Sequence, residues 1–198
     1  MVWKIFSKKS KKKKKVISYE EAKALAVDGD EKSRADLAGR NDVPREVLYY
    51  LADDPSPNVR KSIASNTAAP EHADLLLAKY KNENVRSSLA KKIARLSPGL
   101  TADEQNRLRH MTYDALSILA KDQATRVRQI LSEALRDVAN APPDVIRRLA
   151  WDVEAAVATP ALQFSLILND EDLIEIIRAK PSEGCTQTVS QRENVSNA

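Results

Sequence analysis

The sequence predicts an all-α protein built from repeated helical hairpins, and three observations favour this fold class. One short phrase recurs five times along the 198 residues, prolines recur in register with it, and no useful stretch alternates between apolar and polar residues as a strand does. Hydrophobic residues make up 42% of the chain and charged residues 30%, which is typical of a folded domain. Because a short hairpin cannot bury its apolar side alone, we expect successive hairpins to stack and share one elongated core.

The recurring phrase reads Leu-Ala-x-Asp, then five residues, then Arg. It begins at Leu25, Leu51, Leu77, Leu119 and Leu149, and the first three copies are 26 residues apart. Its last two positions are filled by Asp28 and Arg34, Asp54 and Arg60, Tyr80 and Arg86, Asp122 and Arg128, and Asp152 and Ala158. Tyrosine thus replaces the aspartate once, and alanine replaces the arginine once.

The first helix of a hairpin is predicted to begin near a proline and to end at the Leu-Ala of the phrase. Pro44, Pro70 and Pro142 each stand seven residues before the leucine of their copy. Proline in the first helical turn loses no intrahelical hydrogen bond, so it suits a helix start. The aspartate then lies where this helix ends.

The second helix is predicted to follow turn residues such as those of segment 54–57, Asp-Pro-Ser-Pro. Its apolar positions recur in at least two copies: Val59, Ile63 and Ala64, then Val85, Leu89 and Ala90. Between Arg86 and Arg128 the spacing grows to 42 residues and includes a Ser-Pro-Gly break at 97–99 and a capping box at 101–104. We therefore expect one longer hairpin in the middle of the chain.

The aspartates and arginines of the phrase allow two interpretations. The guanidinium group of arginine can donate two parallel hydrogen bonds to a phosphate, so these residues could form an anion-binding site. Recurrence in successive copies is instead what a stacking device requires, and it favours a ladder that pairs these residues within a unit or between neighbouring units. The structural ladder is predicted to comprise Asp28, Arg34, Asp54, Arg60, Arg86, Asp122, Arg128 and Asp152.

Charge divides the chain into two regions of opposite sign. The net charge is +4, but residues 1–15 hold eight lysines and no acid, so the remaining residues sum to 4 − 8 = −4. The sequence therefore predicts a disordered polybasic tail at 1–16, a helical domain at 17–181, and an incomplete further repeat or flexible C-terminus at 182–198. An acidic domain does not favour nucleic acid as its partner.

The tail combines apolar and basic side chains, a pattern that favours contact with an anionic membrane surface. The predicted contact residues are Trp3, Lys4, Ile5, Phe6, Lys8, Lys9, Lys11, Lys12, Lys13, Lys14 and Lys15. A solubilising arm and a nucleic-acid contact are the alternatives. No apolar run approaches the roughly 20 residues of a spanning helix, and no export signal is evident, so a cytoplasmic location, peripheral to the inner membrane, is expected.

Residue types that could carry chemistry are few. His110 and Asp114 lie one turn apart but have no nucleophile or second metal ligand beside them, and Cys185 stands in a polar segment, where we interpret it as incidental. The acids at 170–172 suit a helix start and lack the spacing of a calcium loop. The sequence predicts no catalytic residue, no cofactor site and no metal site.

Short helix pairs with an aspartate six residues before an arginine are similar to HEAT-type repeats, and segment 69–78 also resembles leucine-rich repeat variants. Residues 96–100 (Leu-Ser-Pro-Gly-Leu) together with segments 151–162 and 169–177 closely resemble the alphaproteobacterial DUF2336 family. The resemblance covers roughly residues 18–198 and implies a right-handed α-α solenoid of about five HEAT-like hairpins, without an established activity. Members of that family usually run on through further helices, so this chain is expected to end within a repeat.

These observations lead to a functional hypothesis. We expect a non-enzymatic scaffold that binds an unidentified protein partner along its concave face and is held at the membrane surface by its tail. A nucleic-acid-associated protein is the alternative, and a HEAT-like enzyme is a third possibility. Trp151 is expected in the core, although HEAT-like DNA glycosylases use aromatic residues on a concave face.

Overall fold

The computed structural model describes residues 16–96, 105–139, 141–179 and 182–192, with the side chains of 94–96 and 105–110 left aside. Within these ranges the chain forms twelve α-helices and no strand, which confirms the all-α prediction. The helices are α1 Tyr19–Asp28, α2 Glu31–Ala38, α3 Arg45–Leu51, α4 Pro57–Ser65, α5 Glu71–Ala78, α6 Glu83–Leu96, α7 Gln105–Leu119, α8 Thr125–Leu135, α9 Pro143–Ala150, α10 Ala155–Phe164, α11 Asp170–Ala179 and α12 Cys185–Ser190.

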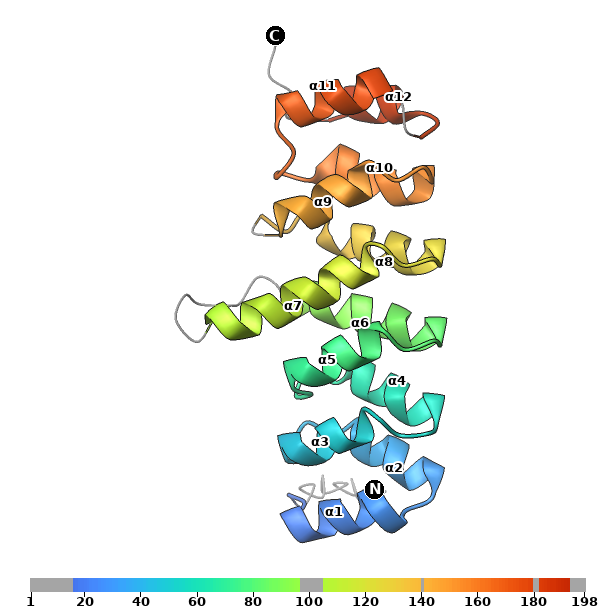
Figure 1. The fold of residues 1–198 in the computed structure, drawn as a ribbon, viewed down its shortest axis with the longest axis vertical. Helices are drawn as coiled ribbons and strands as arrows, with labels where there is room; N and C mark the ends of the chain where they lie inside the picture. Colours follow the sequence, from blue (N-terminus) through green and yellow to red (C-terminus); the bar gives the residue numbers. More distant parts are fainter. Residues whose placement is uncertain (1–15, 97–104, 140, 180–181, 193–198) are drawn as a thin grey trace, which may run out of the picture.

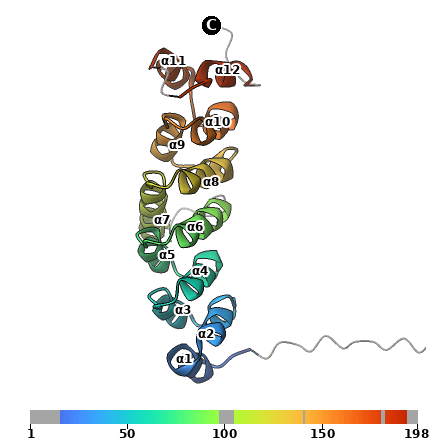
Figure 2. The same cartoon turned by 90° about the vertical axis from the view of Figure 1, so that its right-hand side faces the viewer.

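The helices are arranged in two layers that run along one elongated stack (Figure 1). Odd-numbered helices form one column and even-numbered helices the other (Figure 2). Each even-numbered helix from α2 to α10 packs against the next even-numbered one, and the even layer is packed more closely than the odd layer, where α1 meets α3 and α5 meets α7. The described helices therefore contact mainly their neighbours along the stack.

Helix starts follow local capping chemistry. Ser18 and Glu21 form the reciprocal hydrogen bonds of a capping box at the start of α1. Pro44, Pro70 and Pro142 occupy the N-cap positions of α3, α5 and α9, one residue before the helices that the sequence predicted them to open. The first helices of these hairpins end at or next to the Leu-Ala pair of the phrase, as the repeat pattern predicted.

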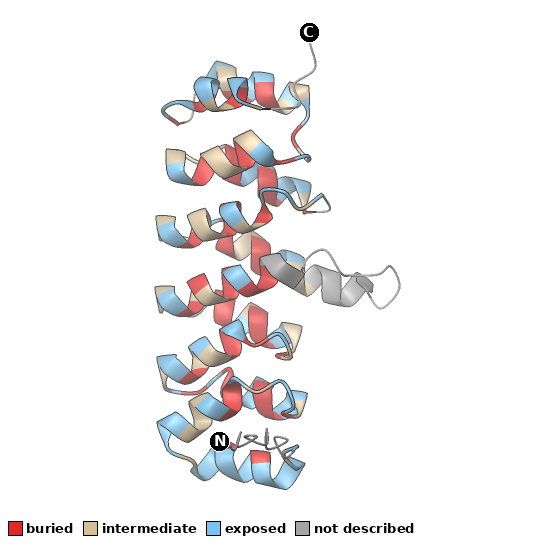
Figure 3. Cartoon of the chain, turned by 180° about the vertical axis from the view of Figure 1, so that it is seen from behind, coloured by how far each residue is buried: buried red, intermediate tan, exposed pale blue. Residues whose placement is uncertain are grey.

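One core cluster of buried residues extends along the whole stack, and Figure 3 shows buried segments in each helical pair. The recurring apolar positions of the second helices are fully buried. They are Val59, Ile63 and Ala64 in α4, and Val85, Leu89 and Ala90 in α6. Burial of each valine, leucine or isoleucine side chain in this set contributes about 1.5–3 kcal/mol to folding, so every unit adds a share of the stability.

Segment 182–192 belongs to the region that was expected to be an incomplete further repeat or a flexible C-terminus, and the structure describes one helix in it. It contains α12, which packs against α10 and α11, and Cys185 at its first position is buried. Gly184 enters the helix at φ +75°, a left-handed conformation that favours glycine. Cys185, interpreted from the sequence as incidental, is thus a buried residue of a helix that packs against α10 and α11.

The extra length expected in the middle of the chain lies in α6, the second helix of one hairpin, and in α7, the first helix of the next. The capping box predicted at 101–104 and the Ser-Pro-Gly break lie outside the described residues. No helix in the described ranges combines the length and the apolar character that crossing a bilayer requires.

Candidate functional site

Guanidinium–carboxylate pairs connect the second helix of one hairpin to the loop of the next. Arg34 donates to both carboxylate oxygens of Asp54, at 2.7 and 3.2 Å. Arg86 binds Asp122 in the same way at 2.5 and 3.0 Å, and Arg128 binds Asp152 at 2.6 and 3.2 Å. In each pair the arginine belongs to one unit and the aspartate to the next, so these arginines reach forward along the chain.

The same arginines also bind the backbone of their own unit. Arg86 donates to the carbonyl oxygen of Tyr80 at 2.8 Å, and Arg128 donates to that of Asp122 at 2.7 Å. The pairing with Asp152 raises the pKa of Arg128, which keeps the guanidinium charged.

The aspartates accept a further hydrogen bond from the backbone two residues on. Asp54 accepts from the N–H of Ser56 at 2.8 Å, and its side chain is only 4% exposed. Asp122 accepts from the N–H of Ala124 at 2.8 Å. Because donors of the protein already occupy these carboxylates, their geometry fits a structural role better than binding of a ligand.

Two members of the predicted ladder lie elsewhere. Arg60 binds the carbonyl oxygen of Asp54 at 2.5 Å rather than its carboxylate, and its guanidinium carbon lies 4.1 Å from the centre of the Tyr80 ring. Tyr80 holds the position of the missing aspartate, so a cation–π contact takes the place of the ion pair to the next unit, while Arg60 pairs with Asp53 of its own unit at 2.9 Å. Asp28 is exposed at the end of α1, where no arginine within the described ranges reaches it.

A second set of polar contacts joins one hairpin to the next in the loops after the second helices. The amide of Asn66 donates to the carbonyl oxygens of Ala38 and Arg40 at 2.7 and 2.9 Å. Arg192 donates to the carbonyl oxygens of Leu162 and Ser165 at 2.5 and 2.8 Å. Sequence reasoning missed these residues, although Asn66 and Arg192 occupy equivalent places in the repeat register and could have been found there.

A buried ion pair links α5 and α6. Lys92 donates to a carboxylate oxygen of Asp74, and only 2% of the lysine side chain is exposed. Burial raises the pKa of Asp74 to about 6, against the opposing effect of the lysine charge. Sequence reasoning also missed this pair. Lys92 stands one residue before Ile93, which belongs to the buried face of α6, and this position could have indicated a buried lysine.

Exposed tyrosines gather on the odd layer around α3. Tyr49 and Tyr50 are 49% and 58% exposed and stand between two grooves. The groove toward α1 is lined by Tyr19, Lys23, Ala26, Val27, Glu46, Val47 and Tyr50. The groove toward α5, with a volume of about 440 Å³, is lined by Arg45, Glu46, Tyr49, Pro70 and His72. The rings of Tyr49 and His72 meet edge to face, with centroids 6.4 Å apart.

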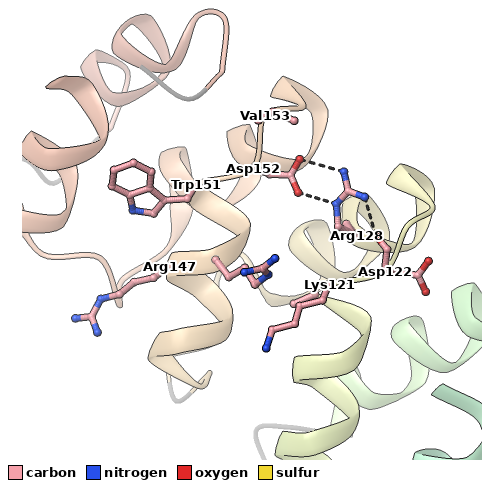
Figure 4. Close-up of a pocket in the computed structure, with 9 residues that line it drawn as sticks. Lys121, Asp122, Arg128, Arg147, Trp151, Asp152 and Val153 are labelled. Carbon is pink, nitrogen blue, oxygen red and sulfur yellow. Dashed lines mark hydrogen bonds and ion pairs between the residues drawn. The ribbon is translucent and has the colours of Figure 1, made fainter. Parts of the chain in front are cut away.

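A basic pocket of about 480 Å³ lies where α7 ends, near the start of α8 and the end of α9 (Figure 4). It is lined by Ala120, Lys121, Asp122, Arg128, Arg147, Arg148, Trp151, Asp152 and Val153. Trp151 is half-buried and packs partly against the core, rather than lying within it as the sequence predicted.

The remaining candidates are placed as follows. The tail residues from Trp3 to Lys15 lie outside the described residues, as does the side chain of His110. Asp172 in the first turn of α11 accepts from Arg147 at 2.9 Å and from the N–H of Asn169 at 3.2 Å. Within the described ranges, no three His, Cys, Asp or Glu side chains are grouped so that they could hold a metal ion.

Comparison with known proteins gives no relative for this chain: no family model, no curated protein and no solved structure matches it.

Proposed function

We propose that this chain is a non-enzymatic scaffold that binds a protein partner. In this proposal it is a right-handed α-α solenoid of about five HEAT-like hairpins, of the kind that its resemblance to the DUF2336 family implies. The forward arginine pairs and the contacts between successive even-numbered helices support this architecture, because both recur along the stack.

The observation that carries the proposed function is the exposed tyrosine ridge of α3. Tyrosine combines a large apolar ring with a hydroxyl, loses little conformational entropy on binding, and is enriched at protein interfaces. Tyr49 and Tyr50 are about half exposed, and a groove lies on each side of them. Side chains of a partner can fill these grooves while the ridge stands between them, which is the arrangement of an interaction surface.

A test should compare this ridge with exposed apolar residues at the other end of the stack. We expect Tyr49→Ser with Tyr50→Ser to remove a specific partner from affinity purifications followed by mass spectrometry. Leu166→Ser with Ile174→Ser is a matched control, since both residues are exposed and apolar. Binding should then be reproduced with the purified partner by calorimetry. The proposal fails if the set of captured proteins is the same for both double variants and the parent.

The lysine tail is proposed to hold the scaffold at an anionic, cytoplasmic membrane surface. Each lysine near such a surface contributes about 1 kcal/mol, and Trp3, Ile5 and Phe6 would add apolar insertion. In flotation with phosphatidylcholine–phosphatidylglycerol vesicles at about 0.15 M salt, deletion of residues 1–15 should abolish binding. Replacing Trp3, Ile5 and Phe6 with alanine should weaken it, and unchanged binding would rule out insertion.

Association with nucleic acid is the alternative function, and the same tail variants test it. A gel shift with duplex DNA and with RNA should depend on the eight lysines of the tail but very little on Trp3, Ile5 and Phe6, because phosphates attract charge alone.

A further inference from the structure

The basic pocket at the end of α9 is lined by two positively charged side chains that form no ion pair with a described residue. Three charged pairs at or beside it balance internally: Arg128 with Asp152, Asp122 with Arg86, and Arg147 with Asp172. Lys121 and Arg148 remain, both exposed and both lining the pocket. The pocket therefore carries an unbalanced charge of about +2 on a domain whose overall charge has the opposite sign.

The groups in this pocket are spread across α9 rather than aimed at one point. In Figure 4, Trp151 and Arg147 project to the side of α9 away from Lys121, while the Arg128–Asp152 pair lies above Lys121. A compact anion could reach only one of these sides. An extended chain could place a charged group at Lys121 and an apolar group against the half-buried Trp151.

We propose that this pocket binds an acidic segment of a protein partner, with carboxylates at Lys121 and Arg148 and an apolar side chain against Trp151. The proposal rests on the protein-binding function proposed above and names the chemistry of a second contact. The pocket already offers an example of such a contact, because the Asp172 carboxylate accepts from Arg147 Nε at 2.9 Å. A long nucleic acid would also meet the surrounding negative charge, whereas a short acidic segment meets mainly the two cations.

The test is a selection of random peptides displayed on phage against the full chain, compared with the Lys121→Gln/Arg148→Gln variant. Both the parent and the variant keep the lysine tail, so any binding of acidic peptides to the tail contributes equally to the two selections. We expect the parent to enrich sequences in which acidic residues flank an apolar residue. In fluorescence anisotropy at about 0.15 M salt, the selected peptides should bind the variant about tenfold more weakly, as two partly exposed ion pairs imply.

A matched control is Lys61→Gln/Arg126→Gln, which removes the same charge from exposed positions on α4 and α8. This control variant should bind the selected peptides as tightly as the parent does. A third variant, Trp151→Leu, should bind the peptides more weakly while its far-ultraviolet circular dichroism spectrum stays that of the parent. The proposal is overturned if no acidic sequence is enriched, if the pocket variant binds as tightly as the parent, or if the control loses as much affinity. Binding of an oligonucleotide alone, lost in the pocket variant, would also overturn it in favour of nucleic acid.

These outcomes separate the two proposals. If the Tyr49→Ser/Tyr50→Ser variant loses its partner while the pocket variant keeps both partner and peptides, only the acidic-segment proposal fails. If the captured proteins are insensitive to both double variants, the scaffold proposal itself fails.

Discussion

Between α1 and α10, arginines in one hairpin bind acceptors in the loop of the next, whereas α11 and α12 are attached by other contacts. Position 158, where the fifth copy of the phrase should have arginine, is Ala158, and the residues after α11 are Lys180 and Pro181 rather than aspartate. Arg147 instead binds Asp172, and Arg192 binds two backbone carbonyls of the α10 region. The comparison teaches that donor and acceptor are lost together at this junction, and that contacts from other positions, Arg147 to a carboxylate and Arg192 to backbone carbonyls, attach the last pair of helices.

The largest effect is expected at Asp54, the most buried carboxylate of the arginine pairs, with 4% of its side chain exposed. Asp54→Ala leaves the Arg34 guanidinium without its carboxylate and the Ser56 N–H without its acceptor. Removal of one partner from a buried pair costs about 3–5 kcal/mol, so the free energy of unfolding in urea should fall by about that amount. Asp53→Ala is the control, since the Asp53 side chain is 75% exposed beside Arg60 and should cost under about 1 kcal/mol. Equal losses in the two variants would contradict a structural role for the forward pairs.

The buried pair of α5 and α6 should make stability depend on pH. The pKa of Asp74 in the folded chain is about 6, against 3.8 for the free side chain, so the folded state holds its proton longer. This contribution is fully present below about pH 4 and is lost as the pH rises through 6, by an amount on the order of 3 kcal/mol. In denaturation series from pH 4 to 7, the stability difference between the parent and Asp74→Asn should therefore fall as the pH rises. A difference independent of pH would contradict the assignment.

Arg192 is one of the side chains that attach the last two helices to the stack. Arg192→Ala removes two charge-assisted hydrogen bonds to the α10 region, each of which contributes about 1.5–3 kcal/mol. Burial lowers the pKa of Arg192, and its buried Nε has no hydrogen-bond partner, so part of the gain is offset and a net loss of about 2 kcal/mol is expected. Hydrogen exchange should show faster exchange in α12 and unchanged protection in α4. Equal acceleration in both helices would mean that the last pair is not a separate unit.

The smallest effect is expected where tyrosine replaces the aspartate. A double-mutant cycle with Arg60→Ala and Tyr80→Leu should give a coupling free energy of about 1 kcal/mol, the value of a partly exposed cation–π contact. A second double-mutant cycle, with Arg34→Ala and Asp54→Ala, measures the coupling free energy of an arginine–aspartate pair, which should be larger. Equal coupling energies would show that ring and carboxylate are equivalent acceptors.

The hairpins could be predicted from sequence because their signals are local. Proline at the helix start, Leu-Ala at its end and a following aspartate act within a few residues of one another. The direction of the arginine pairs could not be predicted, since Asp54 is nearer in sequence to Arg60 than to Arg34. Stacking of the units brings the more distant arginine to the carboxylate.

The contacts that were missed depend on distant parts of the chain. Asn66 and Arg192 bind carbonyls 26 to 30 residues earlier, and Cys185 is buried in a helix that packs against α10 and α11. The basic pocket draws its lining from the regions of three helices, so no single sequence window contains it. Repetition identifies what each unit shares, and it gives no signal for a contact made only once.

The forward direction of the arginine pairs also bears on how such a chain can change length. A segment from one arginine to the next, such as 35–60, contains one acceptor for the unit before it and one donor for the unit after it. If this segment were duplicated in tandem, the first Arg60 would meet the Asp54 of the second copy, and the second Arg60 would again meet Tyr80. Duplication in this register leaves no buried charge unmatched, so the array can be lengthened by whole units without redesigning any junction.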